Sequence, residues 1–234
     1  MTSNSSNKIG HVAIIMDGNS RWARQRNLKT IEGHKQGVNR LRDIVKYSAK
    51  SEITHLSVFA FSTENWKRSA SDVSDLMKLF LQSIIKEVPE LIENKVQLNF
   101  IGDIPRFSKS LVSQINSAMK DTQAKKPNLN LNIAISYGGR WDILNAIKRL
   151  KDQQINIDKI NEEDFSNLLS TSNFPDPDLL IRTGDEIRIS NFFLWQISYS
   201  ELYFSKLLWP DFKLSNFKSA LNKFSKRDRR FGKE

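Results

Sequence analysis

Short apolar segments alternate with longer amphipathic segments along this chain, and no other feature of the sequence restricts the possible folds as strongly. Five apolar runs are typical of buried strands: His11–Met16, Leu56–Ser62, Val96–Gly102, Leu129–Tyr137 and Leu179–Thr183. Helical patterns lie near residues 34–50, 72–94, 109–124, 141–152, 162–170 and 214–226. This alternation predicts an α/β fold with a mainly parallel central sheet and helices on both of its faces.

Length and composition place these elements in a single domain. The chain has 234 residues, and no linker or internal repeat divides it. We expect residues 1–10 to form a disordered polar tail and residues 11–234 to form the folded domain. The tail lacks the apolar core of a signal peptide, no apolar run reaches the roughly 20 residues of a transmembrane helix, and cysteine is absent. These features predict a cytoplasmic protein.

The segment near residues 72–94 carries a broad apolar stripe at helical spacing. We expect Ser71 to cap its start and Pro89 to kink it. Core packing is the ordinary function of such a stripe. The alternative is that part of it walls an elongated apolar cavity, and the sequence leaves both interpretations open.

The net charge of +10 favours anionic partners, which include nucleic acid, phosphorylated small molecules and anionic membranes. A nucleic-acid partner would rest on this charge alone, because the chain has no recognisable nucleic-acid-binding motif, and we expect none. The sequence also lacks G-x-x-x-x-G-K-[ST] and G-x-G-x-x-G, the two commonest loops that bind nucleotide phosphates.

The first expected strand ends in the most informative segment of the chain, Asp17-Gly18-Asn19-Ser20-Arg21-Trp22. In open α/β sheets, ligands bind outside the carboxyl ends of the strands. Here a carboxylate stands at that end, before a turn of small residues whose N–H groups can face an anion. The cation of Arg21 and the flat apolar ring of Trp22 follow. Together they suit a substrate with an anionic head and an apolar body, although an ordinary strand-to-helix turn capped by Asp17 is the alternative.

A second polar segment, Ser62-Thr63-Glu64-Asn65-Trp66-Lys67-Arg68, follows the next expected strand. Asn65 and Arg68 could reach a diphosphate, and Trp66 could cover an apolar tail. An ordinary loop with a helix cap explains the segment equally well. Among the three histidines, His34 is the functional candidate, because it lies at the start of the helical pattern that follows the first motif.

A third polar segment follows the last expected strand and contains Arg182, Arg188 and Ser190 beside a glycine turn. The fork of an arginine side chain matches phosphate oxygens, so two arginines and a hydroxyl group would hold a diphosphate. Further along, Glu201 stands in an aromatic, apolar run. A carboxylate there is expected to be paired or to bind a metal, because an isolated buried carboxylate is costly.

Six ordered segments resemble the cis-prenyltransferases, and most closely their bacterial undecaprenyl diphosphate synthase branch. They are HVAIIMDGNSRWA (11–23), EGHKQG (32–37), FSTENWKR (61–68), YGGRWD (137–142), IRTGDEIRISNFFLWQ (181–196) and SELYF with LWPDF (200–212). The resemblance runs from about His11 to Gly232, so it identifies residues 11–234 as a cis-prenyltransferase catalytic domain.

The resemblance implies a Mg²⁺-dependent enzyme that condenses isopentenyl diphosphate onto an allylic diphosphate such as farnesyl diphosphate. Each step forms a Z double bond and releases diphosphate, and the implied long-chain product is the precursor of the lipid carrier of cell-wall glycans. It also implies a homodimer, an apolar tunnel for the growing chain, and transient association with the inner face of the membrane for product release.

The resemblance also assigns roles to particular residues. The implied metal ligands are Asp17, which assists departure of the allylic diphosphate, and Glu201. The groups implied around the allylic substrate are Gly18, Asn19, Ser20, Arg21, Trp22 and His34. The second segment supplies Ser62, Thr63 and Glu64 at the substrate, Asn65 as the proton acceptor, and the adjacent Trp66 and Arg68. Isopentenyl diphosphate is assigned to Arg182, Arg188, Ile189 and Ser190.

Four departures from the family pattern are present. Ser20 replaces a common glycine, Thr30 replaces a usual arginine that Lys29 could substitute, Ser69 replaces a common proline after Arg68, and Ile187 replaces a histidine that some members use near the metal. Two alternatives keep the same fold: a synthase of short Z-prenyl products, and a catalytically silent accessory subunit. The retained polar residues of the three motifs argue against the second.

Overall fold

The computed structural model describes residues 8–227, and most of the expected N-terminal tail lies outside this range. Gly10, the last residue of the expected tail, lies within the described range and is held by hydrogen bonds. Its N–H donates to Asp178 Oδ2 at 2.8 Å, and its carbonyl accepts the N–H groups of Thr54 and His55 at 2.8 and 3.0 Å. These contacts join the N-terminal segment to the sheet.

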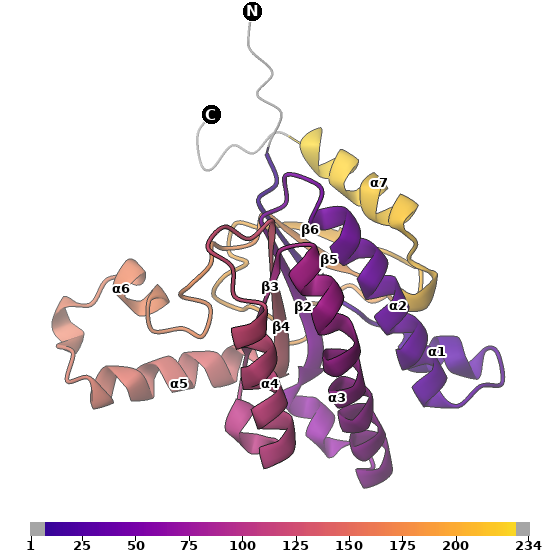
Figure 1. Ribbon diagram of the computed structural model, residues 1–234. Coiled ribbons are helices and arrows are strands. Elements are labelled where there is room, and N and C mark those ends of the chain that lie inside the picture. The colour runs from indigo at the N-terminus through magenta and orange to yellow at the C-terminus, as the bar shows by residue number, and fades with distance from the viewer. Residues whose placement is uncertain (1–7, 228–234) are drawn as a thin grey trace, which may run out of the picture.

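The central sheet has six strands, all parallel, in the order β3-β4-β2-β1-β5-β6 (Figure 1). The strands are β1 (His11–Ile15), β2 (His55–Ser62), β3 (Val96–Ile101), β4 (Leu129–Tyr137), β5 (Leu179–Arg182) and β6 (Glu201–Phe204). The first five confirm the predicted strands to within one residue at each end. The edge strand β6 is not predicted, because its four residues are short of a full strand pattern and only partly buried.

Seven α-helices connect and cover the strands in the described part of the chain. They are α1 (Asn19–Arg24), α2 (Thr30–Ser48), α3 (Ala70–Glu93), α4 (Lys109–Asp121), α5 (Gly139–Asp152), α6 (Glu162–Ser166) and α7 (Leu214–Ser225). Single 3₁₀ turns lie at η1 (Thr63–Lys67), η2 (Ile104–Arg106), η3 (Ile157–Lys159) and η4 (Trp209–Asp211). The six predicted helices are present, although α6 is shorter than expected, and the short α1 replaces the expected turn.

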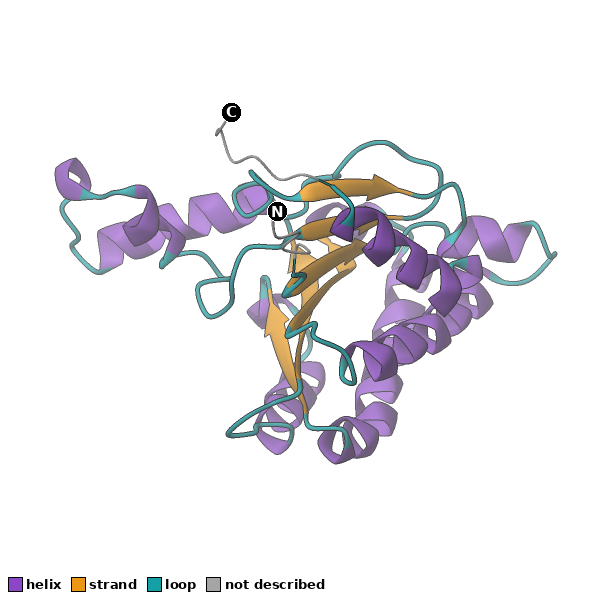
Figure 2. Cartoon of the chain, turned by 90° about the horizontal axis from the view of Figure 1, so that it is seen from above, coloured by secondary structure: helices purple, strands orange, loops and turns teal. Residues whose placement is uncertain are grey.

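The two faces of the sheet are covered differently. The larger core lies under α2, α3, α4 and α7 and contains Val12, Ile14, Leu56 and Val58 of the sheet. On the other face, the irregular segment 189–197 packs Phe192 and Phe193 against the strands, while α5 and α6 project outward (Figures 1 and 2). Most of the helical cover is therefore on one face, and the irregular segment supplies much of the packing on the other.

The long helix α3 begins two residues earlier than the sequence suggests. Ser69, not Ser71, is the N-cap, and its Oγ accepts the N–H of Asp72 at 3.1 Å. The helix continues through Pro89 to Glu93. None of the helices within residues 8–227 is long and apolar enough to cross a membrane.

Candidate active site

The mouth of a large cavity lies where the strand order changes direction. β1 is paired with β2 on one side and with β5 on the other, so the carboxyl ends of these three strands are neighbours. All three predicted motifs follow these strands, and they meet at the mouth for that reason. This is the position at which open parallel sheets bind ligands.

Asp17 and Arg182 form the centre of the mouth. Arg182 Nη2 lies 2.9 Å from Asp17 Oδ2, and Arg21 Nη2 lies 3.2 Å from Asp17 Oδ1. The Arg182 side chain is only 4% exposed, while that of Asp17 is 31% exposed. Arg182 Nη1 also donates to Ser190 Oγ at 2.6 Å and to the Arg188 carbonyl at 2.5 Å. The first and third motifs are thus joined through one buried guanidinium group.

A left-handed glycine positions the residues that follow Asp17. Gly18 has φ +115°, and a Cβ at this position would lie 2.9 Å from Leu208 Cα. The turn brings Asn19, Ser20 and Arg21, the first residues of α1, to the cavity wall. Gly18, not Asp17, is therefore the N-cap of α1. The small and basic residues that follow Asp17 lie at the mouth, as predicted.

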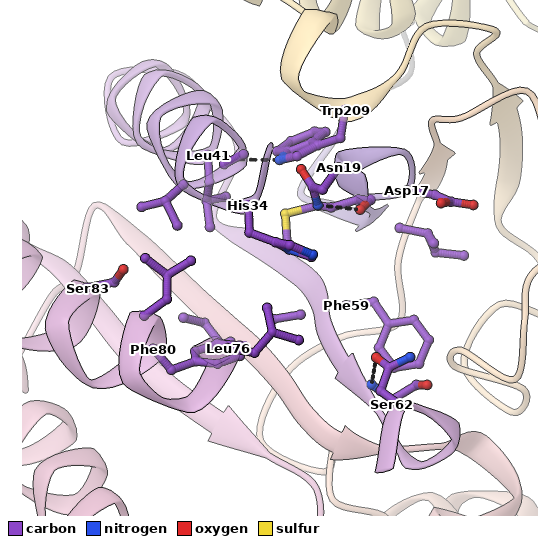
Figure 3. A pocket seen from close by; sticks show the side chains of 18 of the residues that line it. Asp17, Asn19, His34, Leu41, Phe59, Ser62, Leu76, Phe80, Ser83 and Trp209 are labelled. Atoms are coloured by element: carbon purple, nitrogen blue, oxygen red, sulfur yellow. Dashed lines mark hydrogen bonds between the residues drawn. The ribbon is translucent and has the colours of Figure 1, made fainter. Parts of the chain in front are cut away.

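The second motif forms η1, and part of it faces the cavity. Ser62, Glu64, Asn65 and Arg68 line the wall, and Asn65 Oδ1 accepts the N–H of Ser62 at 3.0 Å (Figure 3). Burial alone would raise the pKa of Glu64. Hydrogen bonds from its own backbone, from Asn191, and from the hydroxyl groups of Ser62 and Thr63 outweigh burial and hold that pKa below its usual value. Glu64 is therefore ionised at neutral pH.

His34 projects from α2 into the same cavity (Figure 3). Its buried Nε2 has no hydrogen-bond partner within the described residues. Burial, followed by the nearby charge of Arg68, lowers the pKa of His34 to about 4. The imidazole is therefore neutral at pH 7, and its free nitrogen faces space that a ligand can occupy.

We predict that stability falls as pH drops below about 6.5, because both His34 and His11 are held neutral. Burial lowers the pKa of His11 to about 4, and its Nδ1 and Nε2 lie 2.6 Å from the Pro175 carbonyl and 2.7 Å from Ser57 Oγ. Between pH 6.5 and 4 the unfolded chain binds these two protons and the folded chain does not. The free energy of unfolding should then fall by up to about 2.7 kcal/mol per pH unit.

Guanidinium denaturation at pH 7, 6 and 5 checks this expectation, with His34→Gln as the diagnostic variant. His34→Gln removes one of the two histidines, so the change in unfolding free energy per pH unit should fall by about half. A parent protein whose unfolding free energy is constant over this range would contradict the neutral state of the two histidines.

Behind the mouth, the cavity is apolar and elongated. Its volume is about 960 Å³, and it runs between α2, α3 and the sheet. Leu41 on α2 faces Leu76 and Phe80 on α3, and Phe59 of β2 lies near the mouth (Figure 3). The apolar stripe of α3 thus both packs on the core and lines the cavity, which are the two interpretations that the sequence left open. Val73, Met77, Leu81 and Val88 pack on the core without lining the cavity.

Thirteen of the predicted site residues line this cavity: Asp17, Gly18, Asn19, Ser20, Arg21, His34, Ser62, Glu64, Asn65, Arg68, Arg182, Arg188 and Ser190. Four others do not. Trp22 Nε1 donates to Asp211 at 2.8 Å, and Trp66 Nε1 donates to Ser136 at 2.9 Å. Both indole N–H groups therefore have partners outside the cavity lining. Thr63 lies beside Gly138, and Ile189 packs on the opposite face of the sheet.

Glu201 is not brought to Asp17 within one chain. It begins β6, where it is in register with Leu179 at the start of β5, and so lies at the other end of the sheet. Its carboxylate forms an ion pair with Arg227. Of the two outcomes expected for this acid, pairing is therefore the one seen. No group of three or more His, Asp or Glu residues that could hold a metal occurs in residues 8–227.

Sequence reasoning missed three polar residues at the mouth: Arg24, Glu186 and Asn191. Glu186 forms ion pairs with both Arg21 and Arg188 and so holds two phosphate-binding candidates in place. The sequence offered one indication that Glu186 lies at the mouth, which is its position four residues after Arg182 in the same glycine turn. Lys29 and Thr30 start α2 without lining the cavity.

Comparison with known proteins agrees with this geometry. The family described as "putative undecaprenyl diphosphate synthase" matches residues 15–232. A (2E,6E)-farnesyl-diphosphate-specific ditrans,polycis-undecaprenyl-diphosphate synthase from Photorhabdus laumondii is 47% identical, and the match covers 95% of this chain and 89% of the relative. An isoprenyl transferase from Neisseria gonorrhoeae is 48% identical, with the same coverage of 95% and 89%.

Two solved structures have the same fold. Lavandulyl diphosphate synthase from Lavandula x intermedia, in complex with dimethylallyl diphosphate, gives a TM-score of 0.92 at 36% identity and covers 97% of this chain and 99% of its own. A probable undecaprenyl diphosphate synthase from Campylobacter jejuni gives a TM-score of 0.82 at 34% identity, with coverage of 97% and 100%.

Proposed function

The chain belongs to the undecaprenyl diphosphate synthase family of cis-prenyltransferases, and on this basis we propose that it elongates farnesyl diphosphate with isopentenyl diphosphate to a long-chain polyprenyl diphosphate. The observation that carries this proposal is a single cavity with a basic, polar mouth and an apolar body. A substrate that joins a diphosphate head to a hydrocarbon chain fits both parts.

The mouth can hold two diphosphates side by side. On one side of Asp17, the residues that follow β1 and the side chains of His34 and Arg68 face the space above the apolar body, where an allylic diphosphate would place its head. On the other side, Arg182, Arg188 and Ser190 offer two guanidinium groups and a hydroxyl for isopentenyl diphosphate. Charge-assisted hydrogen bonds of this kind are roughly twice as strong as neutral ones.

Asp17 fits a magnesium ion that is bound with substrate. Mg²⁺ is usually held by one or two carboxylates together with substrate phosphates, not by a cage of protein groups. The partly exposed Asp17 carboxylate at the mouth, without a cluster of further acids among residues 8–227, matches this pattern. A magnesium ion bound there would neutralise charge that develops on the departing diphosphate.

In each cycle the allylic carbon–oxygen bond breaks and its electron pair leaves with the diphosphate. The double bond of the isopentenyl group attacks that carbon, and a proton is lost as the new double bond forms. Arg21 and Arg68 stabilise the leaving group, while Arg182 orients the attacking substrate. Asn65 Oδ1, the proton acceptor implied by the resemblance, already accepts one hydrogen bond from Ser62 and has a second lone pair available.

Short-chain synthesis is the second candidate function. It is favoured by the TM-score of 0.92 to a structure named for lavandulyl diphosphate. The depth of the apolar body, which extends along most of α3 to Leu91 and Val96, favours the long-chain product. A silent accessory subunit is disfavoured because one chain assembles the whole mouth.

A homodimer is part of the proposal. Leu144 and Ile147 on α5 and Leu202 on the edge strand β6 are exposed apolar side chains that a second copy could cover. A second copy is also the only arrangement in which Glu201 could approach Asp17, because one chain holds them at opposite ends of the sheet. Transient contact with a membrane surface would help release of an apolar product.

Incubation with labelled isopentenyl diphosphate, farnesyl diphosphate and Mg²⁺ tests the proposed function. We expect label to enter solvent-extractable material only when the allylic primer is present. Absence of incorporation with farnesyl, geranyl and dimethylallyl diphosphates alike would contradict the proposal.

A further inference from the structure

Asn191 connects three segments that come together at the mouth of the cavity. It follows Ser190 in the loop after β5 and lines the cavity wall. Its side-chain Nδ2 donates to Glu64 Oε1 of η1 at 2.9 Å, and its Oδ1 accepts the N–H of Arg140 in the first turn of α5 at 3.0 Å. Its carbonyl accepts the N–H of Gly139 at 2.7 Å. One asparagine therefore holds the loop after β5 against both η1 and α5.

The backbone around Asn191 has a conformation that needs support from its surroundings. Ser190, Asn191 and Phe193 have φ angles of +47°, +64° and +49°. Asparagine tolerates this left-handed region better than most residues, whereas a bulky aromatic residue seldom adopts it. Such a backbone persists only where the surrounding structure determines it. The hydrogen bonds of Asn191 therefore help to fix the position of Ser190.

The amide group of Asn191 also lies in a closely filled space. A Cβ at Gly138 would lie 2.6 Å from Asn191 Nδ2 and 2.8 Å from Thr63 Oγ1. The lack of a side chain at Gly138 thus allows Asn191 and η1 to approach each other. This packing restricts rotation of the amide away from Glu64.

The two segments that Asn191 joins to each other carry groups from both sides of the mouth. Ser190 Oγ accepts a hydrogen bond from Arg182 Nη1 at 2.6 Å, so it belongs to the basic group that we propose binds isopentenyl diphosphate. On η1, Glu64 directly precedes Asn65, and both residues line the cavity. The distance between Ser190 and Asn65 therefore depends on the hydrogen bond from Asn191 to Glu64.

We propose that Asn191 is a positioning residue that places the isopentenyl diphosphate site, through Ser190, relative to Asn65 on η1. The inference rests on the proposed function and gives a role in that reaction to a residue that the sequence motifs did not single out. A misplacement of about 1 Å can lower the rate of a reaction by roughly a hundred-fold. Loss of the Asn191 amide should therefore slow prenyl transfer, although this amide takes no part in making or breaking bonds.

The first test is Asn191→Gly, which removes the amide and keeps a residue that tolerates positive φ. We expect kcat to fall by about ten-fold or more, because the two substrates and Asn65 are less precisely aligned. The KM for isopentenyl diphosphate should rise several-fold, while the KM for the allylic primer should stay close to that of the parent. A general loss of structure would instead change both KM values and lower the thermal unfolding midpoint.

Asn27→Gly is the matched control. Asn27 also has a left-handed backbone, with φ +54°, but it is exposed and does not line the cavity. This substitution removes the same side chain from the same kind of backbone. It should leave kcat and both KM values unchanged.

A second variant, Asn191→Asp, isolates the contact with Glu64. The new carboxylate can still accept the N–H of Arg140, but it faces the carboxylate of Glu64 in place of a donor, and like charges repel. We expect kcat to fall at least as far as in Asn191→Gly. Adding Glu64→Gln removes the repulsion and supplies a new N–H donor. In a double-mutant cycle, kcat of Asn191→Asp/Glu64→Gln should exceed the value expected from the two separate losses by about ten-fold.

Calorimetric titration with isopentenyl diphosphate alone tests Asn191 without turnover. We expect weaker binding to Asn191→Gly than to the parent, and parental binding to Asn27→Gly. If Asn191→Gly does not fold, Asn191→Asp replaces it in the titration. Parental kcat and parental affinity in a folded Asn191 variant, or strictly additive losses in the double-mutant cycle, would overturn the inference. Failure of the parent to elongate any allylic primer would contradict only the proposed function.

Discussion

Replacing Asp17 with alanine should lower kcat by roughly a thousand-fold, or about 4 kcal/mol of transition-state stabilisation. The carboxylate lies at the centre of the mouth and contacts both Arg21 and Arg182. It is also the acidic residue that we propose holds Mg²⁺ with the allylic diphosphate. The measurement is turnover at saturating concentrations of both substrates and of Mg²⁺.

Two controls separate this effect from loss of folding. Asp43→Ala removes a carboxylate that pairs with Arg40 on the exposed side of α2, and it should not change kcat. Asp17→Asn keeps the size of the side chain and one hydrogen-bond acceptor but removes its charge, so it should be nearly as impaired as Asp17→Ala. Turnover of either Asp17 variant within a few-fold of the parent would refute the metal-binding role.

Arg182→Ala should raise the KM for isopentenyl diphosphate by about 100-fold or more, which corresponds to about 2.7 kcal/mol of binding free energy. Hydrogen bonds to charged groups contribute about 1.5–3 kcal/mol each. Arg182 is nearly buried and links Asp17 to Ser190, so its loss removes a phosphate ligand and the support of the adjoining loop.

The expected effect of Arg188→Ala on the KM for isopentenyl diphosphate can be compared with that of Arg182→Ala. The Arg188 side chain is 58% exposed and pairs with Glu186, so its contribution is more strongly screened by water and its effect should be smaller. Both variants should keep the KM of the allylic primer within a few-fold of the parent. If the primer's KM rose while that of isopentenyl diphosphate held, the two diphosphate positions would have to be exchanged.

The position of Asp17 and Arg182 was predictable because it depends on where two strands end. An apolar run followed by Asp17, and another followed by Arg182, suffices to place two residues at one edge of a parallel sheet. Their 2.9 Å contact then follows from β1 and β5 being neighbours. The sequence could not supply that pairing, but the shared edge made the contact possible.

Some predicted site residues lie outside the cavity lining for one of two reasons. Either the side chain points elsewhere, or the residue belongs to a strand that the sequence analysis did not predict. Trp22 and Trp66 stand in the predicted motifs, yet each indole N–H has a partner outside the cavity. The direction of a side chain in a short helix or a 3₁₀ turn is not encoded in motif spacing. Glu201 begins β6, a strand that the sequence analysis did not predict, and a residue at the start of a parallel strand lies at the end opposite the active edge.

The sequence also could not show which apolar residues of α3 line the cavity and which pack only on the core. Leu76 and Phe80 line the cavity, whereas Met77 and Leu81, one position further along α3, pack on the core without lining it. All four belong to the same apolar stripe, so hydrophobic periodicity treats them alike. The separation of α2 from α3 decides which of them face open space, and long-range packing sets that separation.

The stereochemistry and length of the product test the central claim most directly. The parent protein would be incubated with ¹³C-labelled isopentenyl diphosphate, farnesyl diphosphate and Mg²⁺, and the dephosphorylated product analysed by chromatography and NMR. We predict a chain of several added five-carbon units in which every new double bond has the Z configuration. New double bonds of E configuration, or no elongation of any allylic primer, would contradict the account.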